Sequence, residues 1–140
     1  ERCNVQLIVK NHPLSYLYRV ADLVSFFDGY GWERIGIGYD FANGCFGRED
    51  PIEALQLLKS RIKLIYAADT GLDEFRHDTV GAGAVRFSDI AGALRAFGYR
   101  GDTVLEILSD DPDRALATSI AQLETHAWPR RDASQMTSET

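Results

Sequence analysis

The chain has 140 residues, of which 45% are hydrophobic and 26% charged, and its formal net charge is −6. This balance is typical of one globular domain. No apolar run approaches the roughly 18 residues that a membrane helix needs, and the negative charge argues against general nucleic-acid binding, which requires a basic surface. Two cysteines, Cys3 and Cys45, are too few for a disulfide framework and lack metal-ligand spacing, so a reducing, cytoplasmic setting is expected.

Four apolar runs with the composition of buried strands follow one another, and each leads into a segment with helical spacing. The strands are predicted over residues 5–9, 35–39, 62–68 and 103–108. The helices are predicted over 16–30, from Asp50-Pro51, from a capping Ser88 to Phe97 with Gly98 as the stop, and from Asp111-Pro112. The glycines of the second strand fit close packing inside a barrel. Such alternation predicts parallel strands joined by right-handed crossovers.

Three segments lack this pattern. Residues 41–49 are predicted to be a loop, and the connection from Asp69 to Phe87 is long and polar, which is typical of a lid or a binding loop. From His126 onward Pro, Arg, Ser and Thr prevail, which predicts a disordered tail over 126–140 after a domain spanning 1–125.

The four units amount to about half of a (β/α)8 barrel of the TIM type, which needs about 250 residues. A free half would leave two unpaired strand edges, and purely parallel sheets are normally covered on both faces. The chain also starts at Glu1, without an initiator Met and almost directly before an apolar run. We therefore expect the remaining strands to come from an N-terminal segment or from a partner chain, and a homo-oligomer stays open.

Polar residues end the predicted strands at what should be one rim: Lys10, Asp40, Tyr66 and Glu106, with Asp69 just beyond the third strand. In a barrel the C-terminal strand ends form the active-site face. Glu106 lies in an apolar run, where a carboxylate must be desolvated or paired. It is therefore either one half of a buried ion pair, with Lys10 or an arginine, or a functional group. Asp40 either serves the site or caps a turn before Asn43-Gly44.

Several short motifs follow in a fixed order. They are Lys10-Asn11-His12, Asp40-Phe41-Ala42-Asn43, Tyr66-Ala67-Ala68-Asp69, Val80-Gly81-Ala82-Gly83, Gly98-Tyr99-Arg100-Gly101 and Glu106. Together they resemble the C-terminal half of the xylose-isomerase-like sugar phosphate isomerase/epimerase family, over residues 5 to about 124. The resemblance implies a (β/α)8 barrel in which one divalent metal, held by Glu, Asp, His and Glu, polarises a sugar carbonyl and hydroxyl. Two glutamates of the family exchange a proton at the adjacent carbon through an enediolate.

The chain departs from the family pattern at three positions. Lys10 stands where the first glutamate is expected, Tyr66 where the histidine is expected, and Asn43 at an auxiliary histidine, while Asp40 and Glu106 match. A protonated Lys10 would repel a metal such as Mn, Mg, Zn or Co. It would equally replace the metal, because an ammonium between two carboxylates neutralises them without an ion.

Histidines elsewhere are the candidates for completing a metal site. His12 shares the strand parity of Lys10, and His77 lies on the long polar connection, from which it would have to reach in. A metal, if bound, is expected on Asp40, Glu106 and His12.

The pattern leaves two kinds of function open. The first is a diverged sugar (phosphate) isomerase or epimerase acting on a small carbohydrate, with Glu106 as acid/base and Lys10 as second proton carrier or electrostatic stabiliser. Its substrate contacts are expected from Asn43, Tyr66, Asp69, Arg76 and His77. The alternative is a catalytically degenerate, metal-free barrel that binds a ligand or serves as a structural subunit. The fold alone does not choose between them.

Overall fold

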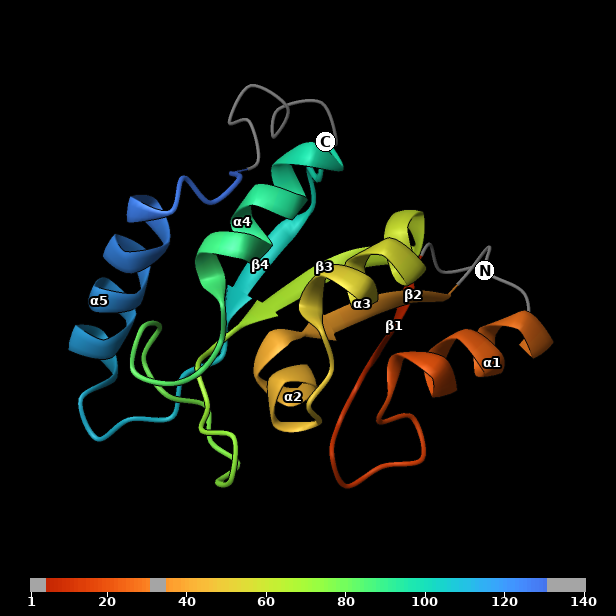
Figure 1. Ribbon diagram of the computed structural model, residues 1–140, viewed down its shortest axis with the longest axis horizontal. Coiled ribbons are helices and arrows are strands. Elements are labelled where there is room, and N and C mark those ends of the chain that lie inside the picture. The colour runs from red at the N-terminus through yellow and green to blue at the C-terminus, as the bar shows by residue number, and fades with distance from the viewer. Residues whose placement is uncertain (1–4, 31–34, 131–140) are drawn as a thin grey trace.

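Four strands form one parallel sheet. The computed structural model describes residues 5–30 and 35–130. The strands are β1 (Leu7–Lys10), β2 (Ile35–Asp40), β3 (Ile62–Ala67) and β4 (Asp102–Leu105), in the spatial order β1-β2-β3-β4. Each neighbouring pair is parallel, so the predicted topology is confirmed, and β1 and β4 form the two edges (Figure 1).

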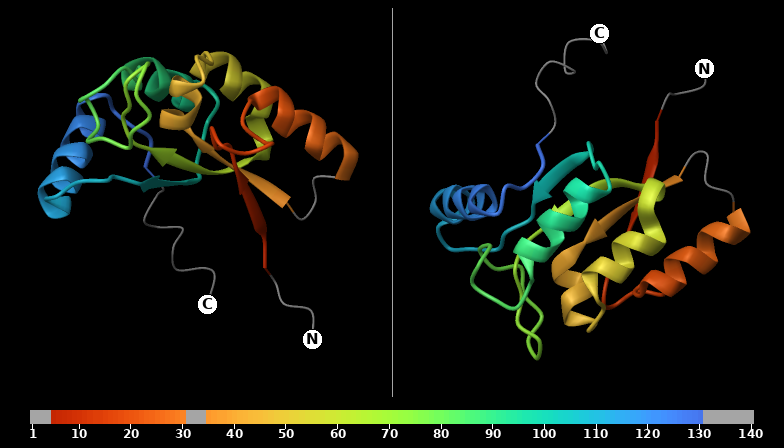
Figure 2. Two further views of the ribbon diagram at one scale, coloured as in Figure 1. Left: turned by 90° about the horizontal axis from the view of Figure 1, so that it is seen from below. Right: turned by 45° about the horizontal axis from the view of Figure 1, so that its top comes forward.

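The helices cover one side of this sheet. They are α1 (Val20–Tyr30), α2 (Phe41–Phe46), α3 (Pro51–Leu58), the short 3-10 turn η1 (Lys59–Arg61), α4 (Phe87–Ala96) and α5 (Pro112–Thr125). Figure 2 shows α1, α3 and α4 on the same side of the strands, and no helix of the described ranges on the other side. A curved parallel sheet with its helices outside is half of a (β/α)8 barrel, as the sequence predicted.

Side chains alternate between the two faces of the sheet, with a period of two. Ile37, Tyr39 and Ile65 face the helices and are buried there. They join a core to which the helices contribute, among others, Leu23, Phe27, Leu55, Leu58, Ile90 and Leu94. On the opposite, inner face, a Cβ on Gly38 would lie 2.9 Å from both Ile8 Cγ2 and Tyr66 Cε2. Only glycine lets these two side chains approach across β2, in agreement with the predicted close packing.

Two elements near the N-terminus differ from their prediction. Helix α1 begins at Val20 rather than at residue 16, because the Glu49 carboxylate accepts a hydrogen bond from the Val20 amide at 2.8 Å and satisfies the first turn. The predicted loop 41–49 contains α2. This helix forms because Asp40 caps it, with Oδ1 accepting from the Asn43 amide at 3.0 Å.

Two further boundaries are also corrected. Helix α4 starts at Phe87 after Arg86, with no side-chain cap, so the predicted Ser88 cap is wrong. The predicted disordered tail does not begin at His126, because Trp128 is buried against Phe41 and Phe87 and its Nε1 donates to Thr103 Oγ1 at 3.0 Å. Burial of so large a ring fixes the chain at least this far; residues 131–140 lie outside the described residues.

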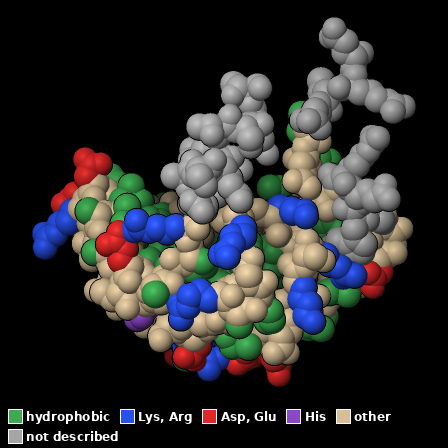
Figure 3. Space-filling view, turned by 90° about the horizontal axis from the view of Figure 1, so that it is seen from above, with side chains coloured by type: hydrophobic (Ala, Val, Ile, Leu, Met, Phe, Trp, Pro, Cys, Tyr) green, Lys and Arg blue, Asp and Glu red, His purple; other side chains and the backbone are tan. Residues whose placement is uncertain are grey.

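Two findings concern the surface and the expectations drawn from composition. In the described ranges no helix is both long and apolar enough to cross a membrane. On the face in Figure 3, Lys and Arg side chains are interspersed with apolar and other groups rather than gathered in one dense patch. The cytoplasmic setting and the role of Cys3, which lies outside the described residues, stay predictions.

Candidate functional site

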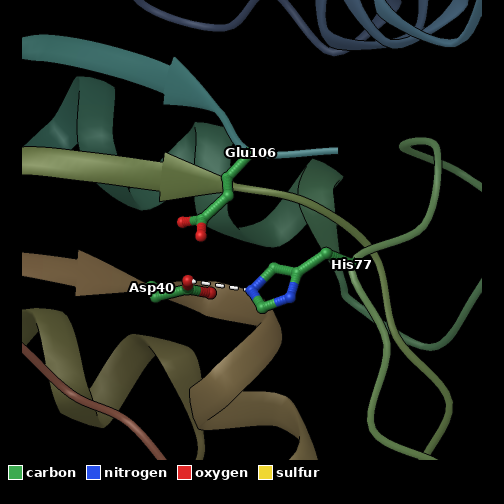
Figure 4. A group of neighbouring side chains, drawn as sticks. All are labelled: Asp40, His77 and Glu106. Atoms are coloured by element: carbon green, nitrogen blue, oxygen red, sulfur yellow. Dashed lines mark hydrogen bonds and ion pairs between the residues drawn. The ribbon is translucent and has the colours of Figure 1, made fainter. Parts of the chain in front are cut away.

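Four charged or titratable side chains meet at the C-terminal ends of the strands. Lys10 ends β1, Asp40 ends β2, Glu106 follows β4, and His77 comes from the loop between β3 and α4. Lys10 Nζ lies 3.1 Å from Asp40 Oδ2 and 2.5 Å from Glu106 Oε2, and His77 Nε2 lies 3.2 Å from the same Asp40 oxygen. Figure 4 shows Asp40, His77 and Glu106 pointing toward one another. We call these four residues the rim cluster.

The Asp40 carboxylate has two separate tasks. Its Oδ1 caps α2 through the Asn43 amide, and its Oδ2 receives both Lys10 and His77. The capping role that the sequence left open for Asp40 is confirmed, and its role in the site stays a prediction. Because the cap fixes one oxygen, the other oxygen is held in a fixed direction toward Lys10 and His77.

Asn11 supports Asp40 from the neighbouring strand. Its Oδ1 accepts from the Asp40 amide at 2.8 Å, and its Nδ2 donates to the Asp40 carbonyl at 3.1 Å. Asn43 Nδ2 in turn donates to the Asn11 carbonyl at 2.7 Å. Asn11 is fully buried. The sequence analysis names Asn11 within a motif but gives it no role. A polar residue directly after a buried strand is the signal that could have identified it.

The charges in the cluster stabilise one another. Burial alone would lower the pKa of Lys10, but its hydrogen bond with Glu106 and the charge of Asp40 outweigh burial, so the pKa of Lys10 is raised above its ordinary 10.5. Burial alone would raise the pKa of Asp40, but hydrogen bonds from His77 and the Asn43 amide, with the charge of Lys10, lower it below 3.8. Lys10 is therefore an ammonium and Asp40 a carboxylate at neutral pH.

Exposure separates the four residues into two pairs. The side chains of Glu106 and Lys10 are 42% and 23% exposed, whereas those of His77 and Asp40 are 8% and 0% exposed. The Lys10 ammonium also lies 4.4 Å from the centre of the Tyr66 ring, a cation–π distance. A small molecule at the rim would thus meet Glu106 and Lys10 first, with Asp40 and His77 beneath them.

The metal implied by the family resemblance can be tested on this geometry. Asp40, His77 and Glu106 each offer one oxygen or nitrogen, all within 4.8 Å of one another, and this donor set suits a divalent metal. However, the Lys10 ammonium bonds to an oxygen of each of the two carboxylates. A positive charge between the acidic ligands does not fit a resident dication. Nor does His12 join the group, because its Nδ1 accepts from the Leu14 amide and its ring packs on Phe75.

The remaining predicted contacts lie outside the rim cluster. The Arg76 guanidinium pairs with Glu74 and Asp78 on its own loop. Asp69 is fully buried, and its carboxylate accepts only backbone amides of the same loop in the contacts described. Asn43 is buried in α2, and its Oδ1 has no hydrogen-bond partner in the described ranges. Of the predicted substrate contacts, the structure therefore brings Tyr66 and His77 to the cluster.

Known proteins with a similar fold include sugar epimerases and a probable dehydratase. A D-tagatose 3-epimerase-like protein superposes with a TM-score of 0.77 at 19% identity, covering 88% of this chain and 47% of its own. The 3-keto-D-glucoside 4-epimerase YcjR from E. coli gives 0.70 at 20%, covering 86% and 46%. A probable 3-DHS dehydratase, AsbF from Bacillus anthracis, gives 0.73 at 15%, covering 86% and 50%. The chain thus spans about half the length of these structures.

Sequence comparison agrees with the structural comparison. No curated protein matches the chain significantly in sequence. A family model described as xylose isomerase-like TIM barrel matches residues 1–126. The chain therefore belongs to the xylose isomerase-like TIM barrel family.

Proposed function

We propose that this chain carries the site of a sugar isomerase or epimerase in which the Lys10 ammonium takes the place of the divalent metal. The observation that carries the proposal is the position of Lys10 Nζ, which bonds to Asp40 and Glu106 at the strand ends of a family barrel. Two of the similar structures are named as sugar epimerases, which supports a small carbohydrate as substrate. The probable dehydratase among them shows that the fold alone does not fix the reaction.

The exposed pair would do the chemistry. The Glu106 carboxylate removes a proton from the carbon next to the substrate carbonyl, and the C–H electrons move into the carbonyl to give an enediolate. The Lys10 ammonium stabilises the negative oxygen that forms. In an isomerisation Glu106 returns the proton to the neighbouring carbon, while Lys10 gives a proton to the former carbonyl oxygen and takes one from the adjacent hydroxyl group, so that the carbonyl moves by one carbon. In an epimerisation Lys10 delivers a proton to the opposite face and recovers one from Glu106 through their hydrogen bond.

The buried pair would act indirectly. Asp40 holds Lys10, and His77 holds the same Asp40 oxygen. A raised Lys10 pKa keeps the proton on nitrogen, which supports the role of electrostatic stabiliser rather than that of a base. Tyr66, whose ring faces Lys10, is the best-placed further substrate contact.

Solvent exchange in the intact protein tests this function. The protein is treated with chelator, its metal content is measured by mass spectrometry, and ketohexoses and ketopentoses, free and phosphorylated, are incubated with it in D2O. We expect NMR to show deuterium entering the carbon next to the carbonyl without added metal. Glu106→Gln should lower the exchange rate by roughly 100-fold, and Glu53→Gln, on the exposed face of α3, should leave it unchanged.

One observation favours the alternative of a binding barrel without turnover. The short Lys10–Glu106 ion pair engages Oε2 of the carboxylate that would act as base, an arrangement that is equally expected of a purely structural ion pair. If sugars bind in the same NMR experiment but no deuterium enters them, the binding role is supported. Exchange that requires added Mn, Mg, Zn or Co would contradict the metal-free proposal.

A further inference from the structure

The loop between β3 and α4, residues 68–86, has no helix or strand of its own, yet it delivers His77 to Asp40. Its one regular feature is a backbone bridge between Asp69 and Asp78, with amide-to-carbonyl distances of 2.9 and 2.8 Å. Asp78 is the chain neighbour of His77. An irregular loop holds a buried imidazole in place only where its backbone is itself fixed.

The Asp69 side chain ties this loop together. Its Oδ1 accepts from the amides of Thr70 at 2.9 Å and Val85 at 3.0 Å, and its Oδ2 accepts from the Gly81 amide at 2.9 Å. These amides lie at the start, the middle and the end of the loop. A fully buried carboxylate with three backbone donors is a strong, charge-assisted anchor.

We propose that Asp69 is a positioning residue: by gathering the amides of the loop it sets the backbone from which His77 reaches Asp40. The proposal rests on the proposed function only in taking His77 as part of the site. It reassigns Asp69 from the substrate contact expected from its place after the strand to a role inside the loop. It also implies that residues 68–86 are held in one position rather than opening and closing as a lid.

A second contact shows how closely the loop is drawn around Asp69. A Cβ on Gly83 would lie 2.4 Å from the Thr70 carbonyl oxygen and 2.5 Å from Asp69 Oδ1. No side chain fits there without moving the loop away from the carboxylate. The loop is also held at His77 itself, whose carbonyl accepts a hydrogen bond from the Leu108 amide at 2.8 Å. His77 is therefore fixed between the loop and the segment after β4.

The chemistry of Asp69 makes it sensitive to a small change. An asparagine offers one acceptor oxygen, and its NH2 group would face at least one of the three amides, donor against donor. Asp78→Asn is the matched control in the same loop. The Asp78 backbone makes the bridge, whereas among the described residues its side chain makes a 3.7 Å ion pair with Arg76.

Chemical labelling of the intact protein tests the proposal without relying on turnover. Diethyl pyrocarbonate modifies accessible histidines, and His77 is buried. In Asp69→Asn we expect modification of His77, located by peptide mass spectrometry, to be at least tenfold faster, with His126 as internal reference unchanged. Hydrogen exchange at the amides of residues 70, 81 and 85 should accelerate in parallel. Asp78→Asn should behave as the wild type in both measurements.

Turnover and a second variant complete the test. Where the wild type exchanges solvent deuterium, Asp69→Asn should lower kcat about tenfold and change KM little, because Asp69 touches no substrate. If Asp69→Asn does not fold, Gly83→Ala must expose His77 in the same way. A folded Asp69→Asn or Gly83→Ala protein in which His77 and the three amides stay protected would overturn the inference. A wild type without exchange, but with His77 exposed in Asp69→Asn, would refute the proposed function and leave the inference standing.

Discussion

The two faces of the sheet belong to the same strands but differ in how far their side chains are buried and in what stabilises them. On the outer face Ile37, Tyr39 and Ile65 are at most 1% exposed beneath the helices. On the inner face Ile8 is 41% and Val104 38% exposed, and the polar strand ends form the rim cluster. Hydrophobic burial stabilises the outer face, whereas paired charges stabilise the end of the inner face at which we propose the chemistry. Changes on the two faces should therefore have different sizes and different pH dependence.

The largest effect is expected on the outer face. Ile65→Ala removes a fully buried side chain from β3 and leaves a cavity under α3 and α4. We expect the free energy of unfolding to fall by about 3.5 kcal/mol, measured by urea titration. Ile120→Ala is the control, because Ile120 is about half exposed on α5, and its cost should stay below about 1 kcal/mol. Equal losses in the two variants would show that the helices do not cover the outer face as described.

A smaller, pH-dependent effect is expected at the rim. Asp40→Asn removes the carboxylate that Lys10 and His77 share, and we expect a loss of about 2 kcal/mol near neutral pH. The loss is moderated because Lys10 keeps Glu106 as a partner and is partly exposed to water.

The pH dependence of this effect has a definite sign. The folded pKa of Asp40 is lowered below 3.8, so its ionised form stabilises the protein above that value, and the stabilisation is lost as the pH falls through the folded pKa. The difference in unfolding free energy between wild type and Asp40→Asn should be constant from pH 8 to about pH 4 and shrink below it. A difference that persists unchanged at about pH 2 would assign the effect of the substitution to packing rather than to charge.

Local signals in the sequence were enough to predict the four strands, most of the helices and the topology of the sheet. The β-branched runs, the Asp-Pro helix starts at Asp50 and Asp111, and the alternation of strands and helices gave the parallel sheet and its order. Because parallel strands end at one edge, the same reading placed Lys10, Asp40 and Glu106 together. These predictions held because each strand and helix depends on residues that are close in sequence, and the parallel topology then determines which strand ends meet.

The features that sequence reasoning missed depend on distant partners. Helix α2 is the exception, because its Asp40 cap is local, and there Asn43-Gly44, which favours a turn, led to the prediction of a loop. Helix α1 starts where Glu49, from another segment, meets the Val20 amide. The reach of His77 into the site depends on a loop that lacks periodicity, and the burial of Trp128 depends on a pocket built from α2 and α4. No local pattern encodes such contacts.

The smallest effect on stability is expected on the inner face of the sheet, and it tests whether further strands cover that face. The chain spans about half the length of similar barrels, and β1 and β4 have open edges, so we propose that further strands of the intact protein complete the barrel. A completed barrel would bury Val104, and Val104→Ala should then cost about 1.5 kcal/mol in the intact protein. The backbone amides of β1 and β4 should also exchange as slowly as those of β2 and β3. A cost below about 0.5 kcal/mol, with fast exchange in the edge strands alone, would mean that the inner face stays open to water. The rim cluster would then lie on a half-barrel that no further strands complete.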